Sequence, residues 1–119
     1  MTDAAARTTL RLCRLAEIED GAARGFTVDL PDGPQDIFVV RDGSHIHGYV
    51  NACPHQGTPL DWTPDQFMTE DGAYIVCATH GALFKIEDGD CIAGPCAGDH
   101  LQRVSVTLDA EGCVCLSIG

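Results

Sequence analysis

The sequence has few basic residues, few aromatic residues and no long hydrophobic run. Its 119 residues include 7 Lys and Arg against 18 Asp and Glu, which gives a net charge of −11. A surface this acidic repels the phosphates of nucleic acids and of anionic lipids, so we expect neither as a partner. The same charge favours docking on basic patches of other proteins, and it also serves solubility.

Signals that would direct the chain into or across a membrane are also missing. Residues 1–7 contain no apolar run of signal-peptide length and no twin arginine, and no later run approaches a membrane span. We therefore expect a cytoplasmic protein with no membrane partner. The 7 cysteines do not change this expectation, because their number is odd and no secretion signal accompanies them.

Segments with the apolar spacing of a long helix are absent as well, and strand-like segments take their place. Acidic residues followed by glycine separate many of these segments, as turns do in antiparallel sheets. We expect one all-β domain over residues 1–119, with a single helical turn in 15–20. The strands are predicted over residues 8–13, 26–30, 37–40, 45–50, 73–77, 83–86, 103–108 and 113–118.

Two short motifs each place one cysteine and one histidine in a tight turn. The first is Cys53-Pro54-His55, and the second is Cys77-Ala78-Thr79-His80. A glycine follows each histidine closely, where the backbone has to pass near another group. Two thiols and two imidazoles divided between two turns are typical of a small inorganic centre held from both sides.

Two kinds of centre suit this ligand set. A zinc ion takes two cysteines and two histidines in a tetrahedral site, as in structural binding modules. A [2Fe–2S] cluster of the mixed type takes two cysteines on one iron and two histidines on the other. The single residue between Cys53 and His55 is tight for chelation of one ion but suits ligands of two different irons. The spacing therefore favours the cluster, and metal analysis separates the two.

On these motifs the chain resembles the Rieske iron–sulfur proteins. Residues 53–60 are similar to the family pattern Cys-x-His-x-Gly-x-x-Leu, and residues 77–84 to Cys-x-x-His-Gly-x-x-Phe. Gly94-Pro95, followed by Leu101, is similar to the family's loop over the cluster. The resemblance covers about residues 36–106. It implies a Rieske-like antiparallel β-sandwich with a small cluster-binding subdomain, about 51–97, made of two loops.

The same resemblance implies the ligands and the function. Cys53 and Cys77 are expected on one iron of a Rieske [2Fe–2S] cluster, and His55 and His80 on the other. We expect a one-electron carrier, not an enzyme, that passes electrons from a reductase to a terminal oxygenase or similar enzyme. The alternatives are a small cluster-bearing subunit of a multi-subunit oxidoreductase and, from another class, the zinc module.

Four positions suggest the branch of the family. The quinol-oxidising members have a disulfide at positions matching Thr58 and Thr79, and hydroxyl donors at positions matching Ala82 and Phe84. Hydrogen bonds to the sulfurs stabilise the reduced state, so their loss lowers the potential. We therefore expect a ferredoxin-type protein at the low end of the Rieske range, about −150 mV, with little pH dependence near neutrality.

Other residues are given simpler interpretations. The spacer of 21 residues between His55 and Cys77 is longer than the common family spacing, which places an insertion around 61–72, and we expect residues 62–67 to form a surface excursion. Five cysteines remain, read as buried core residues or, for Cys91 and Cys96, as a bridge. His45, His47 and His100 are read as surface residues. The acidic residues that flank the loops are candidates for partner docking or ordinary surface charge: Asp61, Asp65 and Asp99.

Overall fold

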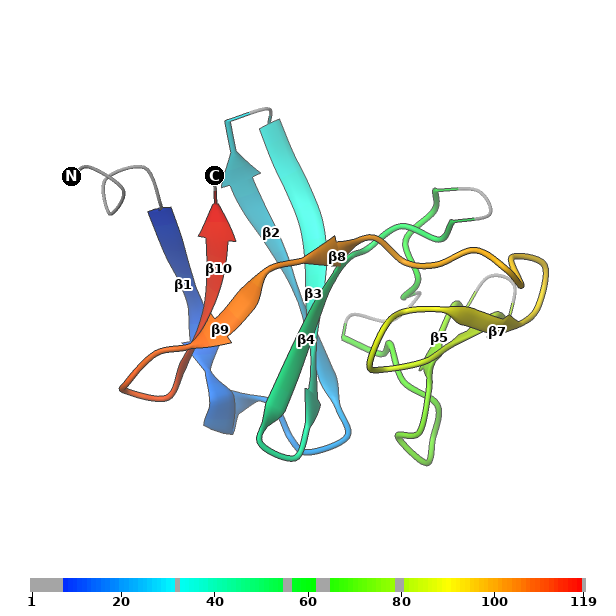
Figure 1. Cartoon of the computed structure of the whole chain (residues 1–119), viewed down its shortest axis with the longest axis horizontal. Coiled ribbons are helices and arrows are strands. Elements are labelled where there is room, and N and C mark those ends of the chain that lie inside the picture. Colours follow the sequence, from blue (N-terminus) through cyan, green and yellow to red (C-terminus); the bar gives the residue numbers. More distant parts are fainter. Residues whose placement is uncertain (1–7, 32, 55–56, 62–64, 79–80, 119) are drawn as a thin grey trace.

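The computed structural model describes residues 8–31, 33–54, 57–61, 65–78 and 81–118. The described chain is nearly all β, with one 3₁₀ turn where a helical turn is expected (Figure 1). None of its helices has the length and apolar character needed to cross a membrane. The elements are β1 (Thr8–Arg14), η1 (Leu15–Glu17), β2 (Ala23–Leu30), β3 (Gly33–Asp42), β4 (His45–Val50), β5 (Ile75–Val76), β6 (Leu83–Phe84), β7 (Cys91–Ala93), β8 (Arg103–Val104), β9 (Val106–Leu108) and β10 (Cys113–Ile118).

The strands form three antiparallel sheets. Their orders are β1-β10-β9, β2-β3-β4-β8 and β5-β6-β7. The first two sheets lie beside each other, and the third lies at the end of the molecule away from both labelled termini (Figure 1). This arrangement confirms the predicted all-β fold.

The central strand β3 contributes to three buried clusters because its four apolar residues alternate in direction. Phe38 and Val40 belong to the core that includes the third sheet, whereas Ile37 and Val39 belong to the cores between the first two sheets. All four side chains are at most 1% exposed. A continuous apolar run is what a strand buried on both faces requires.

The strand predicted over 103–108 is wrong in one respect, because the chain changes sheets within it. β8 pairs with β4, Ser105 interrupts the strand, and β9 pairs with β10. The crossing is close: a Cβ on Gly48 would lie 2.8 Å from Val104 Cγ2. Only a residue without a side chain lets this segment pass over β4.

The predicted surface excursion over 62–67 is wrong at Phe67, although Asp65 and Gln66 are exposed as expected. Phe67 is fully buried and stacks on Phe38 with the ring centroids 4.3 Å apart. The Phe67 carbonyl accepts a hydrogen bond from Val76, and Met68 bridges to Ile75. The end of this segment therefore extends the third sheet and supplies an aromatic side chain to the core.

Candidate metal centre

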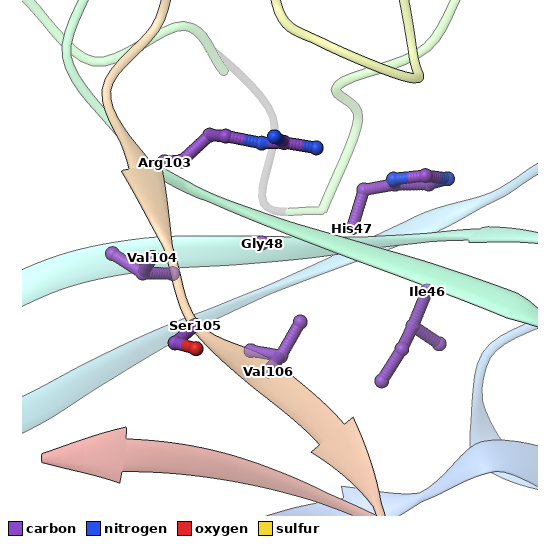
Figure 2. A pocket seen from close by; sticks show the side chains of 7 residues that line it. All are labelled: Ile46, His47, Gly48, Arg103, Val104, Ser105 and Val106. Atoms are coloured by element: carbon purple, nitrogen blue, oxygen red, sulfur yellow. The ribbon is translucent and has the colours of Figure 1, made fainter.

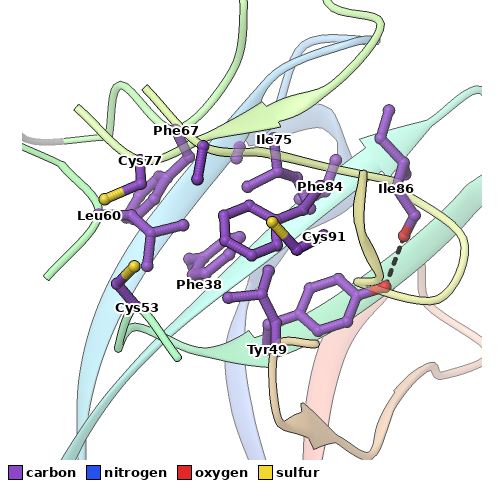
Figure 3. Close-up of a cluster of buried hydrophobic side chains, with 14 of the residues drawn as sticks. Phe38, Tyr49, Cys53, Leu60, Phe67, Ile75, Cys77, Phe84, Ile86 and Cys91 are labelled. Atoms are coloured by element: carbon purple, nitrogen blue, oxygen red, sulfur yellow. Dashed lines mark hydrogen bonds between the residues drawn. The ribbon is translucent and has the colours of Figure 1, made fainter. Parts of the chain in front are cut away.

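Short strands deliver both candidate thiols to the same end of the molecule. β4 ends at Val50, three residues before Cys53, and β5 ends at Val76, immediately before Cys77. Both cysteines are buried, with 1% and 0% of their surfaces exposed. Figure 3 shows the two sulfur atoms on the same side of the core, next to Leu60. The structure therefore brings together the two cysteines that the motifs predict as ligands.

The two loops have the same backbone hydrogen bonds although their histidine spacings differ. The Cys53 carbonyl accepts from the Gly57 N–H (2.6 Å), and the Cys77 carbonyl accepts from the Gly81 N–H (2.7 Å). Both glycines have positive φ, 74° and 67°. Each loop is thus a tight turn that closes four residues after its cysteine, at a residue that tolerates the left-handed region.

A second pair of hydrogen bonds repeats this correspondence. The Cys53 N–H donates to the Thr58 carbonyl (2.8 Å), and the Cys77 N–H donates to the Ala82 carbonyl (2.9 Å). His55 and His80 fall within these turns by sequence, but they lie outside the described residues. Their role as ligands rests on the motifs and on the shared form of the two turns.

Asn51 holds the end of the first loop at the point where that loop bonds to the second, a role that the motifs did not indicate. Its side-chain carbonyl accepts from the Leu60 N–H (2.8 Å), and its amide donates to Asp61 (3.0 Å). The Leu60 carbonyl in turn accepts from the Ala78 N–H of the second loop (2.8 Å). The sequence signal is an Asn just before a loop, where its side chain can satisfy backbone groups.

A third loop, formed by residues 91–99, covers the second one. Gly94 has φ +99°, and a Cβ built on it would lie 2.8 Å from Ala82 Cα. The loop closes by hydrogen bonds from the Cys91 N–H to the Asp99 carbonyl and from the Asp99 N–H to the Cys96 carbonyl. The turn predicted to cover the centre is therefore in direct contact with a ligand loop.

The described residues fit an iron–sulfur centre in their chemistry and packing. Two buried thiols converge between tight turns, and thiolate sulfur is the ligand such a centre requires. The hydroxyl oxygen of Thr58, also in the first loop, is buried and finds no hydrogen-bond partner among the described residues. Ala82 and Phe84 are fully buried and carry no hydroxyl that could donate to a sulfur.

The remaining histidines lie outside this centre. His45 is exposed, and His100 is exposed with its Nδ1 3.0 Å from the Leu101 carbonyl. His47 is half-buried, and burial lowers its pKa. It lines a groove of about 410 Å³ with Arg103 and Val106 on β4, β8 and β9, and neither candidate cysteine lines that groove (Figure 2).

The flanking carboxylates prove to be partly structural. Asp65 accepts a hydrogen bond from the Gly25 N–H (2.8 Å) and has the unusual φ of 68° for a residue other than glycine. Asp61 bonds to Asn51, as described above, and Asp99 is exposed. Two of the three thus hold the segment after the first loop to β2 and to Asn51.

Comparison with protein families gives a match over most of the chain. Residues 8–107 match the model described as the Rieske [2Fe–2S] domain. A search of curated proteins finds no match.

Solved structures of similar fold include two ferredoxins. The ferredoxin of carbazole 1,9a-dioxygenase from Nocardioides aromaticivorans IC177 is 26% identical, with 92% of this chain and 96% of that chain covered and a TM-score of 0.72. The Sphingomonas yanoikuyae B1 ferredoxin is also 26% identical, with 94% and 100% covered and a TM-score of 0.70. A chain described as the small subunit of an NADH-dependent nitrite reductase from Mycobacterium tuberculosis shares the fold at 17% identity, with 95% and 96% covered and a TM-score of 0.67.

Proposed function

We propose, from the premise that this chain belongs to the Rieske [2Fe–2S] domain family, that Cys53, His55, Cys77 and His80 hold its [2Fe–2S] cluster. The observation that carries the assignment is the pair of matching turns around two buried cysteines. Cys53 and Cys77 would bind one iron as thiolates, and the two imidazoles would bind the other. We further propose residues 51–97 as the subdomain that encloses the centre.

The protein is an electron carrier and is not itself a catalyst. When bound, the cluster takes up and releases one electron, at a potential raised by replacing two thiolates with neutral imidazoles. The chain's own contribution is to exclude water from the sulfur side, where Leu60 and Phe84 are fully buried. We place the electron's exit at the imidazole side, where the neighbouring glycines Gly57 and Gly81 are exposed.

The partners we propose are a reductase as donor and a terminal oxygenase as acceptor. A similar ferredoxin has been solved in complex with the oxygenase of carbazole 1,9a-dioxygenase. The described residues of the three loops include exposed small uncharged ones, among them Pro59, Gly81 and Pro95, and Ile92 of the third loop is exposed as well. The net charge of −11 would guide this end toward basic patches on both partners.

We propose the cytoplasm as the location, because it is the compartment in which unpaired thiols persist. Cys13, Cys113 and Cys115 are buried thiols, as expected for small core residues in a reducing environment.

Metal analysis tests the ligand assignment directly. The anaerobically isolated protein should contain about two iron and two acid-labile sulfide per chain. Cys53→Ser and Cys77→Ser should each lose the iron and the visible absorbance, whereas Cys13→Ser, at a buried cysteine in another core, should keep both. A content of one zinc and no sulfide, or a full cluster in Cys53→Ser, would refute the assignment.

The second candidate is a fixed subunit of a larger oxidoreductase, which the fold shared with the nitrite reductase small subunit favours. The two functions differ in how the protein occurs in its source cells. A carrier should elute from a sizing column at the size of the free chain, and its electron transfer to the acceptor should slow as salt is raised. Elution of the whole pool with one large partner at a fixed ratio would favour the subunit.

A further inference from the structure

Two cysteines outside the proposed ligand set lie against each other in the third loop. Cys91 begins β7, Cys96 follows the Gly94-Pro95 turn, and their Sγ atoms are 2.9 Å apart. Both side chains are buried, with 6% and 2% of their surfaces exposed. The sulfurs would have to approach by less than about 1 Å to reach the length of a disulfide bond.

The backbone of the loop holds the two thiols in this position. The Cys91 carbonyl accepts from the Gly98 N–H (3.4 Å), and the Cys91 N–H donates to the Asp99 carbonyl (2.9 Å). The Cys96 carbonyl accepts from the Asp99 N–H (2.8 Å). These bonds tie both cysteines to Asp99, so the contact between the sulfurs follows from the closure of the loop.

We propose that Cys91 and Cys96 form a redox-active dithiol that a peroxide converts to a disulfide within the third loop. Hydrogen peroxide oxidises one thiol to a sulfenic acid and leaves as water. The second thiol then attacks that sulfur, the S–S bond forms, and a second water leaves. Each sulfur gives up one electron and one proton, hydrogen peroxide is reduced to two waters, and a thiol reductant reverses the reaction.

The pair also has a contact through which its state reaches the centre. The Cys96 thiol belongs to the same buried cluster as Cys53 and interacts with it electrostatically. As a thiol, Cys96 is a weak donor toward the sulfur of Cys53, and a disulfide has no hydrogen to donate. Donors to a ligand sulfur stabilise the reduced centre, so oxidation of the pair should lower the potential. This second effect rests on the proposed ligand role of Cys53, whereas formation of the disulfide does not.

A single tryptic digest tests the first effect with an internal control. Cleavage at Lys85 and Arg103 gives one peptide, residues 86–103, that holds Cys91 and Cys96, and another, residues 104–119, that holds Cys113 and Cys115. The second pair is equally buried, but Cys115 Sγ faces the Cys113 carbonyl (3.7 Å). The cluster-loaded protein is treated with graded peroxide, alkylated under denaturing conditions and examined by mass spectrometry.

The expected result is that peptide 86–103 loses two hydrogens and takes no alkyl group, while peptide 104–119 takes two. Dithiothreitol should restore alkylation of the first peptide. Two alkyl groups on both peptides at every peroxide level, or equal oxidation of both, would overturn the proposal. This reading does not depend on how the centre transfers electrons.

Potentiometry of three variants tests the coupling. In the wild type and in the matched Cys113→Ser/Cys115→Ser variant, peroxide should shift the potential to a more negative value, and dithiothreitol should restore it. Cys91→Ser should stay at the value of the reduced wild type with or without peroxide, because Cys96 keeps its hydrogen. Cys96→Ala should stay at the value of the oxidised wild type. A disulfide that forms without any shift would overturn the coupling but leave the dithiol site standing.

Discussion

Replacement of Gly94 by alanine should loosen the third loop from the second. A residue other than glycine pays about 1–3 kcal/mol for a φ in this sparsely populated region. A Cβ at this position would also lie 2.8 Å from Ala82 Cα and 3.0 Å from Ala82 Cβ. Overpacking of this kind costs a further 1–3 kcal/mol or so.

Gly98 provides the matched control because it has the same φ of +99° and nothing within 4 Å of its Cβ position. Gly98→Ala therefore carries the backbone cost alone, and the difference between the two variants isolates the contact with Ala82. If unfolding relieves that contact, a difference of about 1–3 kcal/mol corresponds to a rate ratio of roughly 5- to 150-fold.

The assay follows the loss of visible absorbance of the cluster-loaded protein at a fixed urea concentration under anaerobic conditions. Gly94→Ala should bleach faster than Gly98→Ala by that ratio, and Gly98→Ala should bleach only moderately faster than the wild type. Equal rates for the two alanine variants would refute the close packing of the third loop on the second.

Three further predictions concern the core, the pH dependence of stability and the potential. Phe67→Ala should destabilise the protein by about 3–5 kcal/mol in urea unfolding, because it removes a fully buried ring. Tyr74→Ala, at an exposed residue of the same region, should reduce the free energy of unfolding far less. Similar losses in the two variants would contradict the buried position of Phe67. Burial raises the pKa of Tyr49 to about 12 from 10.0, and its hydroxyl donates to the Ile86 carbonyl. The unfolded state therefore loses this proton at a lower pH than the folded state, so the free energy of unfolding of the wild type should fall as the pH rises from 10 toward 12. Tyr49→Phe lacks the hydroxyl and should not show this fall, as urea unfolding at several pH values would test. Identical pH profiles for the two proteins would contradict the buried hydroxyl as the cause. A redox titration should give about −150 mV with little change between pH 6 and 8 or so, because Ala82 and Phe84 offer no hydroxyl to the sulfurs; a value well above zero would contradict this.

Regular alternation and turn residues were enough to predict most of the two larger sheets. The strand at His45–Val50 and the hairpin around Asp42-Gly43 are confirmed, because local pattern and turn chemistry act together there. The third sheet was harder to predict. β5 and β6 have two residues each, and the three-residue β7 was not predicted at all, since a strand this short has no period to detect.

The errors concern contacts between distant segments. Ser105 gives no local sign that the chain changes sheets, because the cause is the close approach to Gly48 on another strand. Phe67 was placed in a surface excursion because its segment shows no regular period, but it fills the space beside Phe38. At the centre, the cysteines could be predicted from their motifs, whereas the Asn51 link required knowledge of how the two loops meet.

Electron paramagnetic resonance of the dithionite-reduced protein tests the central claim most directly, with a His55→Cys/His80→Cys variant as the comparison. The wild type should give one paramagnetic signal with nitrogen couplings from two imidazoles, and the double variant should lack those couplings. A reduced wild type with no paramagnetic signal, or with a signal whose nitrogen couplings persist unchanged in the double variant, would contradict a pair of irons held by two cysteines on one side and two histidines on the other.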